Sequence, residues 1–426
     1  MFYPKRSITA GGETTFLIKN VILKSRKTDI FIRDGKIEKI SPGINRKADQ
    51  RIDGRGQKAV LPGLVNAHVH AAMSLLRGYS DDLPLKDWLE KKIWPIERKF
   101  SPDDIYWGTK LACLEMIRTG TTCFNDMYWF QPAAIEAIKE MGLRAVVGLV
   151  ILDSFPLGRR EYVEKLWQDV KRKIFKTVTF AIAPHAIYSV SRENLVWAKN
   201  FAQANNLLLH IHLSETQKEV SDCLKKYKLR PVEYLDKIGF LNRNCLLAHA
   251  LWLSERETGI LSQRKCSLVY TPCSEMKLVS GIFPYLRVKR AKINVCLGTD
   301  GAASNNNLDL FEEMKFASLL QKVKEMDPAV APGLEIFKAT TENAGQALKI
   351  RVGQIKQGYL ADLILLNLNQ VCFAPGHNLI SNIVYSCNGN CVTDVICQGR
   401  ILMRDGKVEG EEQILKQAAK RAKNFI

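Results

Sequence analysis

The sequence contains no run of about 18 consecutive apolar residues, the length that a membrane-spanning helix needs. Residues 1–15 carry Lys5 and Arg6 but lack the apolar stretch of a signal peptide. The eleven cysteines are dispersed and lie in apolar segments, which is typical of reduced core cysteines. Cys387 and Cys391 have no second pair at zinc-ligand spacing, which disfavours a structural zinc site. We therefore expect a soluble, cytoplasmic protein with no membrane contact and no disulfide framework.

The sequence also lacks the apolar depletion of a disordered chain. Of 426 residues, 46% are hydrophobic and 25% are charged, so the chain can bury a sizeable core. The 62 Lys and Arg exceed the 44 Asp and Glu, and a net charge of +18 first suggests a polyanionic partner. The basic residues are scattered, however, and the only dense cluster is at 416–423. This distribution is typical of a solvated surface, and we expect no nucleic-acid partner.

Both ends of the chain are rich in predicted short strands. Asp34-Gly35 and Asp405-Gly406 each stand between apolar runs, and an Asp-Gly pair favours a tight hairpin turn because both turn residues need positive φ. Neither end is long enough to enclose a core alone. We therefore expect residues 1–61 and 356–426, the latter with a terminal helix, to pack together as one discontinuous β-sandwich domain.

The middle of the chain, residues 62–355, alternates apolar runs with amphipathic stretches. Eight runs read as strands buried on both faces, at 63–68, 121–126, 143–149, 178–183, 207–212, 245–249, 267–270 and 293–298. Eight β/α units of this length predict an α/β protein with a (β/α)₈ barrel. A doubly wound sheet is the alternative, but no Gly-rich phosphate loop follows the first run.

The seven histidines are not placed at random. Six of them lie at or just after the carboxyl ends of predicted strands one, four, five and six: His68, His70, His185, His210, His212 and His249. In a (β/α)₈ barrel these ends converge on one mouth, where active sites are found. The histidines therefore mark a candidate site.

The spacing of these histidines suits a metal. His68 and His70 are two residues apart on an extended segment, so their side chains point the same way. His210 and His212 repeat the pattern on strand five, and one of them is expected to supply a third ligand. Asp300, after strand eight, can supply a carboxylate. Three imidazoles and one carboxylate with an open position suit a catalytic divalent ion such as zinc.

Several segments together resemble the amidohydrolase superfamily, and more narrowly the methylthioadenosine / S-adenosylhomocysteine deaminases with their 5'-deoxyadenosine deaminase relatives. They are LPGLVNAHVH at 61–70, HIHLSET at 210–216, AH at 248–249 and GTDGAASNN at 298–306. The resemblance covers nearly the whole chain. It implies a hydrolase that deaminates purine nucleosides, with homo-oligomers common among the relatives; the sequence leaves the oligomeric state open.

The resemblance also implies roles for single residues. The metal ligands are then His68, His70, His212 and Asp300, with His210 a neighbour on the strand. Members with two metals have a bridging lysine on strand four, where this chain reads Ala-Ile-Ala-Pro-His at 181–185, so one Zn²⁺ is expected. The substrate-binding positions correspond to Trp88, Glu97, Arg159, Arg160, His185, Glu215 and Ser304.

The mechanism that the resemblance implies is an attack of a zinc-activated water on carbon six of the purine. Asp300 accepts the proton of the water, Glu215 protonates ring nitrogen one, and His249 holds the nucleophile. Ammonia then leaves an inosine-type product. Glu215 must be protonated for this role, which a dry pocket favours.

Each of these catalytic residues has a plainer interpretation. Asp300 could be a helix N-cap, because Ala302 and Ala303 follow it. Glu215 could be an acidic residue in the first turn of a helix, placed there by the helix dipole. His249 could be a core histidine.

Two positions depart from the family pattern. Some members hold the homocysteine carboxylate with two arginines after strand three; the first position is Leu149 here, and Arg159 or Arg160 lies near the second. A nucleoside with a smaller, neutral 5' substituent is therefore as good a candidate substrate as S-adenosylhomocysteine. Glu275 stands where the family usually has Asn, and this carboxylate either alters the pocket or pairs with Lys277.

Two other functions compete with nucleoside deamination. One is another ring hydrolase on the same scaffold, acting on guanine, aminofutalosine or a triazine; Glu97 discriminates against a free base, which has no ribose for this carboxylate to bind. The other is a non-catalytic basic barrel that binds nucleic acid or anions. It predicts lost metal ligands, whereas all four are present.

Overall fold

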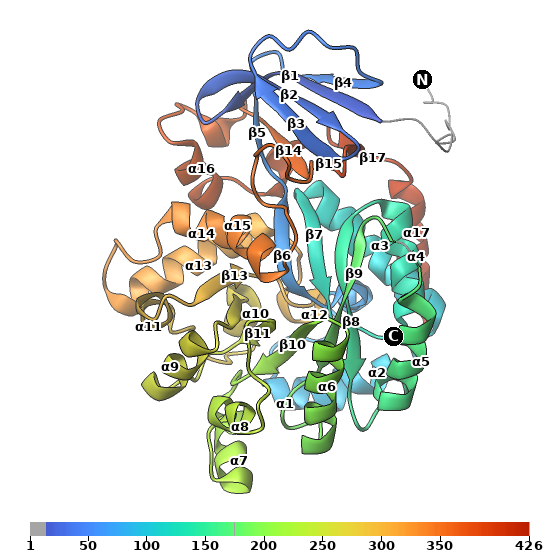
Figure 1. Ribbon diagram of the computed structural model, residues 1–426, viewed down its shortest axis with the longest axis vertical. Helices are drawn as coiled ribbons and strands as arrows, with labels where there is room; N and C mark the ends of the chain where they lie inside the picture. Colours follow the sequence, from blue (N-terminus) through green and yellow to red (C-terminus); the bar gives the residue numbers. More distant parts are fainter. Residues whose placement is uncertain (1–13, 174, 426) are drawn as a thin grey trace.

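The computed structural model describes residues 14–173 and 175–425. Residues 1–13, in which the sequence predicts no signal peptide, lie outside the described residues. Eight parallel strands form one sheet in chain order (Figure 1). These are β6 (Leu64–Val69), β7 (Thr121–Asp126), β8 (Arg144–Ile151), β9 (Val178–Pro184), β10 (Leu208–Leu213), β11 (Cys245–His249), β12 (Ser267–Tyr270) and β13 (Asn294–Leu297).

The first and last strands of this sheet close on each other. The Asp300 N–H, just after β13, donates to the His68 carbonyl of β6 at 3.1 Å. The Asn66 side chain donates to Thr299 Oγ1 at 2.7 Å and accepts from the Thr299 N–H at 3.1 Å. The eight expected strands therefore form a barrel, and the α/β fold class with a (β/α)₈ barrel is confirmed.

Alternate side chains of each barrel strand fill two separate cores. Inside the barrel lie mostly small residues, including Val65, Cys123, Val146 and Cys296. On the outside, larger apolar side chains of the strands pack against the surrounding helices. Both faces of the strands are thus buried, which explains their continuous apolar sequences.

Helices surround the barrel and carry its connections (Figure 1). They are α3 (Pro102–Arg118), α4 (Gln131–Met141), α5 (Arg160–Val170), α6 (Arg192–Ala204), α7 (Gln217–Tyr227), α8 (Pro231–Lys237), α9 (Glu255–Gln263), α10 (Pro272–Lys277), α11 (Tyr285–Arg290), α12 (Ala302–Asn305), α13 (Leu310–Glu325), α14 (Gly333–Ala339) and α15 (Glu342–Ala347). A further segment lies over the barrel mouth and consists of α1 (Leu85–Trp88), the π-helical turn η2 (Leu89–Ile93) and α2 (Trp94–Glu97).

The two chain ends meet in a nine-stranded mixed sheet at the opposite end of the molecule from α1 (Figure 1). Its strands are β1 (Thr15–Leu23), β2 (Arg26–Arg33), β3 (Lys36–Ser41), β4 (Gln50–Asp53), β5 (Lys58–Pro62), β14 (Leu363–Asn367), β15 (Val392–Cys397), β16 (Arg400–Arg404) and β17 (Lys407–Val408). β14 pairs antiparallel with β5, which joins the carboxyl-terminal part to the amino-terminal part. The strands share one apolar core, to which Ile18, Ile30 and Leu365 belong.

The two Asp-Gly pairs form the expected turns. Asp34 and Gly35 have φ of 49° and 72° between β2 and β3, and Asp405 and Gly406 have 46° and 74° between β16 and β17. Both residues of each pair are in the left-handed region, as a tight hairpin requires. The carboxyl-terminal part also contains α16 (Leu379–Tyr385) and the expected terminal helix α17 (Glu411–Ala422), which packs on α3.

A buried ion pair connects the barrel to the mixed sheet. Arg144, at the start of β8, donates from Nε to Asp362 Oδ2 at 2.8 Å and from Nη2 to Oδ1 at 3.2 Å. Asp362 also accepts the Gln398 N–H at 2.8 Å. A bidentate pair with this additional donor is a well-satisfied buried salt bridge.

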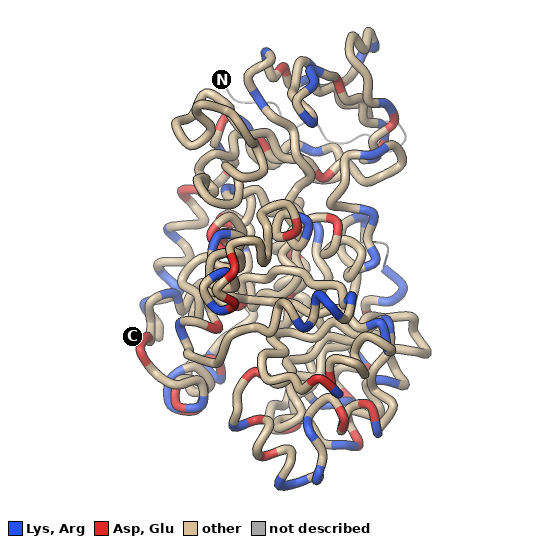
Figure 2. The backbone as a smooth tube through the Cα atoms, turned by 90° about the vertical axis from the view of Figure 1, so that its left-hand side faces the viewer, with Lys and Arg blue, Asp and Glu red and all other residues tan. Residues whose placement is uncertain are grey.

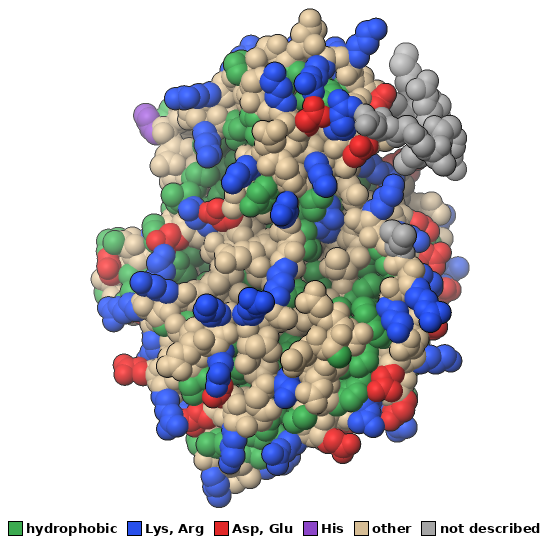
Figure 3. All heavy atoms as spheres, in the orientation of Figure 1, with side chains coloured by type: hydrophobic (Ala, Val, Ile, Leu, Met, Phe, Trp, Pro, Cys, Tyr) green, Lys and Arg blue, Asp and Glu red, His purple; other side chains and the backbone are tan. Residues whose placement is uncertain are grey.

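The charge of the chain is spread over its surface. Lys and Arg alternate with Asp and Glu along the backbone in Figure 2, and on the face drawn in Figure 3 the basic side chains cover both the sheet and the barrel without forming one patch. Among the described residues, no helix has the length and apolar character to cross a membrane.

Candidate metal centre and active site

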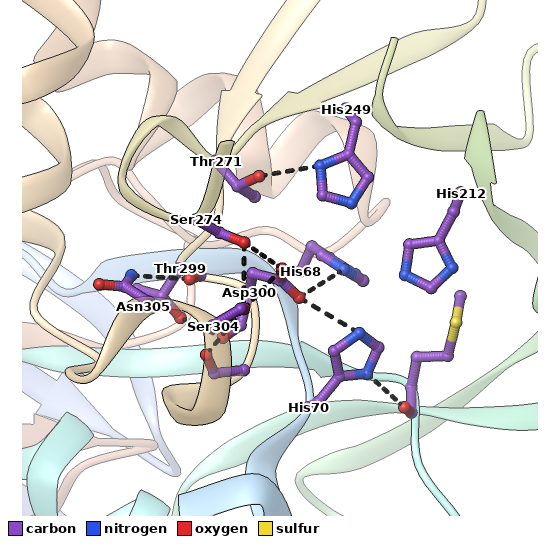
Figure 4. A network of polar contacts seen from close by, with 12 residues as sticks. His68, His70, His212, His249, Thr271, Ser274, Thr299, Asp300, Ser304 and Asn305 are labelled. Atoms are coloured by element: carbon purple, nitrogen blue, oxygen red, sulfur yellow. Dashed lines mark hydrogen bonds and ion pairs between the residues drawn. The ribbon is translucent and has the colours of Figure 1, made fainter. Parts of the chain in front are cut away.

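The residues that the sequence singles out converge at the carboxyl ends of the barrel strands. His68 is in β6 and His70 follows it, His212 is in β10, and Asp300 follows β13. Asp300 Oδ1 lies 3.2 Å from His70 Nε2 and 3.4 Å from His68 Nε2 (Figure 4). The candidate ligand atoms of His68, His70 and Asp300 lie within 4.8 Å of one another, as do those of His68, His212 and His249.

The backbone at β13 makes this convergence possible. A Cβ at Gly298 would lie 2.8 Å from the backbone N and O of His68, so only glycine allows the strand to approach β6 this closely. Asp300 then has φ of 59°, in the left-handed region. The close approach and this turn bring the Asp300 carboxylate against the two histidines.

The hydrogen bonds of the histidines leave nitrogens available for a metal. His70 Nδ1 donates to the Met127 carbonyl at 2.7 Å, and His212 Nδ1 donates to the His185 carbonyl at 2.8 Å. Because a carbonyl oxygen can only accept a hydrogen bond, the proton of each ring is on Nδ1. In the neutral ring Nε2 is then unprotonated, and its lone pair can bind a metal. Both ring nitrogens of His68 are buried and have no hydrogen-bond partner in the described part of the chain.

The charge states suit a divalent cation as well. Burial lowers the pKa of His68 to about 4 and that of His212 well below its ordinary value, so both imidazoles are neutral at neutral pH. Burial opposes ionisation of Asp300, but the imidazoles of His68 and His70 hold its pKa well below the usual range. Burial alone would lower the pKa of His70 too, but the Asp300 carboxylate raises it. Binding of a cation here would displace that proton, which leaves neutral imidazoles and an ionised carboxylate, the donor set that zinc requires.

Hydroxyl groups fix the second oxygen of Asp300. Ser274 Oγ and Ser304 Oγ donate to Asp300 Oδ2 at 2.6 Å and 3.0 Å (Figure 4). The N-cap residue of the following helix α12 is Gly301 and not Asp300, and no side-chain hydrogen bond caps this helix. The carboxylate is thus oriented toward the histidines and not toward the helix. Ser304 lines the pocket and also contacts Asp300.

Glu215 lies in the same pocket, between β10 and α7. Its Oε2 is 3.8 Å from His249 Nε2, and Ser280 Oγ donates to its Oε1 at 3.3 Å. Burial raises the pKa of Glu215, which favours the protonated form. Helix α7 has Thr216 as its N-cap, so Glu215 precedes the helix and its side chain faces the pocket.

Glu219 is a residue of this site that sequence reasoning missed. Its carboxylate accepts the N–H of Ser214 at 2.9 Å and that of Glu215 at 2.8 Å, and it thereby fixes the loop that carries Glu215. Thr216 and Glu219 have the Thr-x-x-Glu spacing of a capping box, and this signal could have identified Glu219. Thr216 Oγ1 accepts the Glu219 N–H at 3.1 Å, as that motif predicts.

His249 ends β11 and lines the pocket, with φ of 69°. Burial alone lowers its pKa, but the carboxylates of Glu215, Glu275 and Asp300 raise it to about 10. Glu275 is buried against His249 Nδ1, whereas Lys277 forms its ion pair with Asp81. The expected alternative of a pair between Glu275 and Lys277 is therefore wrong, and Glu275 instead contacts His249, a residue that lines the pocket.

Besides Glu215 and Ser304, three further expected substrate contacts line the pocket wall: Trp88, Glu97 and His185. Tyr128, which the sequence did not indicate, donates from its hydroxyl to Glu97 Oε1 at 2.7 Å. Trp88 is held by a 3.0 Å hydrogen bond from Nε1 to the Ser80 carbonyl. His185 accepts His212 Nδ1–H on its carbonyl while its ring faces the pocket, so this residue supports the metal site as well.

The expected arginine positions lie elsewhere. The side chain of Leu149 packs in the core between the strands and the outer helices, and Val150 and Leu152 form the pocket wall on β8 and just after it. Arg159 and Arg160 are not among the lining residues, and Arg160 lies 3.6 Å from Glu193. No Lys or Arg within the described ranges lines the pocket. The wall at this strand is therefore apolar.

His210 lies deeper in the barrel than His212. Asn125 Nδ2 donates to its Nδ1, and its ring centroid is 4.9 Å from that of His68. It belongs to neither of the metal-ligating groups found among the described residues. The arrangement agrees with a strand neighbour of the metal site.

Comparisons with known proteins agree with this geometry. The chain is 45% identical to a 5'-deoxyadenosine deaminase of Methanoregula boonei, over 98% of this chain and 96% of the relative. It is 43% identical to 5-methylthioadenosine/S-adenosylhomocysteine deaminase 1 of Archaeoglobus fulgidus, over 94% and 96%. A crystal structure of an adenosine deaminase from Xanthomonas campestris with bound zinc matches with a TM-score of 0.90 and 31% identity, over 97% of this chain and 98% of that one. Residues 59–402 match the model of the amidohydrolase family. The chain therefore belongs to the amidohydrolase family.

Proposed function

We propose that this chain is a zinc-dependent hydrolytic deaminase that converts 5'-modified adenosines to the inosine analogues and ammonia. The substrates would include 5'-deoxyadenosine, 5'-methylthioadenosine, adenosine and S-adenosylhomocysteine. One observation carries the proposal: three of the four proposed metal ligands, a buried acid and a buried carboxylate suited to ribose line one pocket, with His68 directly behind it. The names of the relatives support the same substrate class.

One divalent ion, Zn²⁺, would be held by His68, His70, His212 and Asp300. When bound, zinc supplies Lewis acidity that brings the pKa of water down to about 7. The strand-four sequence Ala-Ile-Ala-Pro-His at 181–185 carries no lysine that could bridge a second ion. A single ion is therefore the stoichiometry that we propose.

The residues of the chain divide the proton transfers between them. Asp300, ionised and next to His68 and His70, takes a proton from the attacking water. Glu215, whose burial favours the acid form, gives a proton to ring nitrogen one of the purine. His249, with Nε2 facing Glu215, holds the water against carbon six. The proton on Asp300 then passes to the leaving amine, and the hydroxyl proton of the intermediate passes to Glu215 as the carbonyl forms, so water and an adenosine yield an inosine and ammonia and both carboxyl groups return to their starting states.

The nucleoside would be held by its sugar and by its 5' substituent. Glu97 is buried, and its carboxylate accepts from Tyr128 and can also accept from a ribose hydroxyl. Trp88 and His185 contribute further contacts on the same wall. Val150 and Leu152 make the β8 side apolar, which favours a small neutral 5' substituent over a charged one.

The alternatives are weaker. Guanine, aminofutalosine or triazine hydrolysis is not favoured, because the relatives with 43–45% identity are named for adenosine-type substrates. A non-catalytic basic barrel is not favoured either, since the candidate ligand atoms of His68 lie within 4.8 Å of those of His70 and Asp300 in one group and of that of His212 in another. The cytoplasmic location stays a prediction from the sequence.

The test is to incubate the zinc-loaded protein separately with methylthioadenosine, 5'-deoxyadenosine, adenosine, S-adenosylhomocysteine and guanine, and to measure ammonia release. We expect turnover of the adenosine compounds, and faster turnover of those with a neutral 5' group. Turnover of guanine without any turnover of the adenosine compounds would contradict the proposal.

A further inference from the structure

A buried carboxylate that the proposed mechanism does not use lies behind His249. Glu275 is in α10, which follows β12, and its side chain is 1% exposed. Its Oε1 is 3.4 Å from His249 Nδ1. An acidic side chain is rarely buried to this extent without a specific partner. The partner here is the imidazole that faces the reaction centre.

Thr271 completes the contact. Both its N–H, at 3.1 Å, and its hydroxyl, at 3.0 Å, donate to Glu275 Oε1. The same hydroxyl oxygen lies 3.1 Å from His249 Nδ1 (Figure 4). Because its only proton is directed to Glu275, Thr271 Oγ1 presents a lone pair to the ring. His249 Nδ1 thus faces two acceptors, and this nitrogen must carry a proton.

The opposite side of the ring faces the chemistry. His249 Nε2 lies 3.8 Å from Glu215 Oε2, and the ring stacks on that of His212 at a centroid distance of 5.5 Å. Two acidic side chains therefore flank the imidazole, Glu275 at Nδ1 and Glu215 at Nε2. When a carboxylate accepts a hydrogen bond from the ring nitrogen that faces away from the reaction centre, here Nδ1, the orientation of the imidazole is fixed. Catalytic and metal-ligating histidines are commonly positioned in this way.

We infer that Glu275 is a positioning residue for deamination: together with Thr271 it holds His249 by Nδ1 and keeps Nε2 directed at the water and Glu215. The inference rests on the proposed function, in which His249 holds the attacking water. A purely structural role is the competing explanation, since Glu275 also accepts the N–H of Thr271 at the start of α10. That role predicts a loss of stability without a specific effect on kcat.

The first experiment compares Glu275→Ala with Glu275→Gln in the zinc-loaded protein, with 5'-deoxyadenosine as substrate. We expect Glu275→Ala to lower kcat by about 10- to 100-fold with little change in KM or zinc content, as for other residues that orient a histidine. Glu275→Gln should recover part of this loss, because an amide oxygen still accepts from Nδ1. A wild-type kcat in Glu275→Ala would overturn the inference.

Glu313→Gln is the matched control. Glu313 is a buried carboxyl group on α13 that accepts from the Cys273 N–H of α10 and from Asn305, without contact to His249. Its substitution should change the unfolding temperature but not kcat. An equal loss of kcat in Glu313→Gln and Glu275→Gln would show a general effect of neutralising buried charge, and would contradict positioning.

Thr271 provides a second route if Glu275→Ala does not fold. Thr271→Val removes only the hydroxyl that contacts Nδ1 and should lower kcat, whereas Thr271→Ser should restore it; equal kcat in both would count against the inference. ¹⁵N NMR of histidine-labelled protein, assigned with His249→Ala, should show a protonated Nδ1, and an unprotonated Nδ1 would overturn the inference. If the wild-type protein itself deaminates no adenosine compound, the proposed function fails instead.

Discussion

The barrel mouth and the contact between the barrel and the mixed sheet both bury charged groups, but they treat them differently. At the contact, Arg144 and Asp362 form a bidentate pair, and Gln398 adds a third hydrogen bond to the carboxylate. At the mouth, His68 has two buried nitrogens without a hydrogen-bond partner in the described chain, beside the ionised Asp300. The charged groups at the contact are fully hydrogen-bonded within the protein, whereas the His68 nitrogens at the mouth need a partner from outside the chain, such as a metal ion.

Whether a buried charged group is fully hydrogen-bonded within the protein thus distinguishes residues that stabilise the fold from residues that take part in the chemistry. A buried pair that is fully hydrogen-bonded contributes to stability only as long as both partners remain. Buried metal-ligating side chains that do not hydrogen-bond to one another lower the stability of the protein until a metal ion binds to them. Substitutions at the mouth should therefore affect activity far more than folding, and substitutions at the contact should do the reverse.

The largest effect is expected for His212→Ala. Loss of one ligand should abolish stoichiometric zinc binding. The rate of deamination should fall by about 10³-fold or more, because a bound metal stabilises the transition state by several kcal/mol. Zinc content by atomic spectroscopy and ammonia release would measure both. Retention of a full equivalent of zinc would contradict the ligand set.

Glu215→Gln should have the next largest effect. The amide cannot donate the proton that the ring nitrogen needs, so kcat should fall by about 10²- to 10⁴-fold, the usual contribution of a general acid. Zinc content should stay at the wild-type value, because Glu215 is not among the expected ligands. A variant with wild-type kcat would remove Glu215 from the mechanism.

Arg144→Ala tests the other region. Removal of one partner leaves Asp362 buried and unpaired, and should lower the free energy of unfolding by about 3–5 kcal/mol. The exposed pair of Arg160 and Glu193 is the control, and Arg160→Ala should change stability by less than about 1 kcal/mol. Chemical denaturation would measure both, and equal losses would contradict the distinction between buried and exposed pairs. The folded Arg144→Ala protein should keep its kcat.

The smallest effect is expected for Ser101→Ala, which lies outside both regions. Ser101 Oγ accepts the Asp104 N–H at 3.3 Å and its own N–H donates to the Asp104 carboxylate at 2.8 Å, so it caps α3. Loss of the cap should cost about 1 kcal/mol of stability without any change in kcat. A change in kcat at a temperature where the variant is folded would show that α3 is coupled to the mouth.

Much of the fold was predictable because local patterns carry it. The apolar runs identified the eight barrel strands, and the Asp-Gly pairs identified two hairpin turns. The turn at Gln398 and Gly399, with φ of 51° and 71°, has the same geometry but no Asp-Gly signal. The contact between Arg144 and Asp362 joins residues 218 positions apart and has no local signature.

The site was predictable to the level of residue types but not of side-chain direction. The spacing of the histidines and Asp300 indicated a metal centre, which the geometry brings together. Leu149 shows the limit, because a shift of one residue along a strand exchanges a pocket-facing side chain for a core-facing one. The partner of Glu275 could not be read either: the sequence offered Lys277, two residues away, and only packing shows that Glu275 contacts His249 while Lys277 pairs with Asp81.

The most direct test of the barrel mouth as a zinc-dependent nucleoside deamination site is the initial rate of ammonia release from 5'-deoxyadenosine before chelation, after chelation, and after zinc is added back. We expect the rate to vanish with the chelator and to return when about one equivalent of zinc is bound. A rate that chelation leaves unchanged, or a zinc-loaded protein that releases ammonia from guanine but not from 5'-deoxyadenosine, would contradict this function.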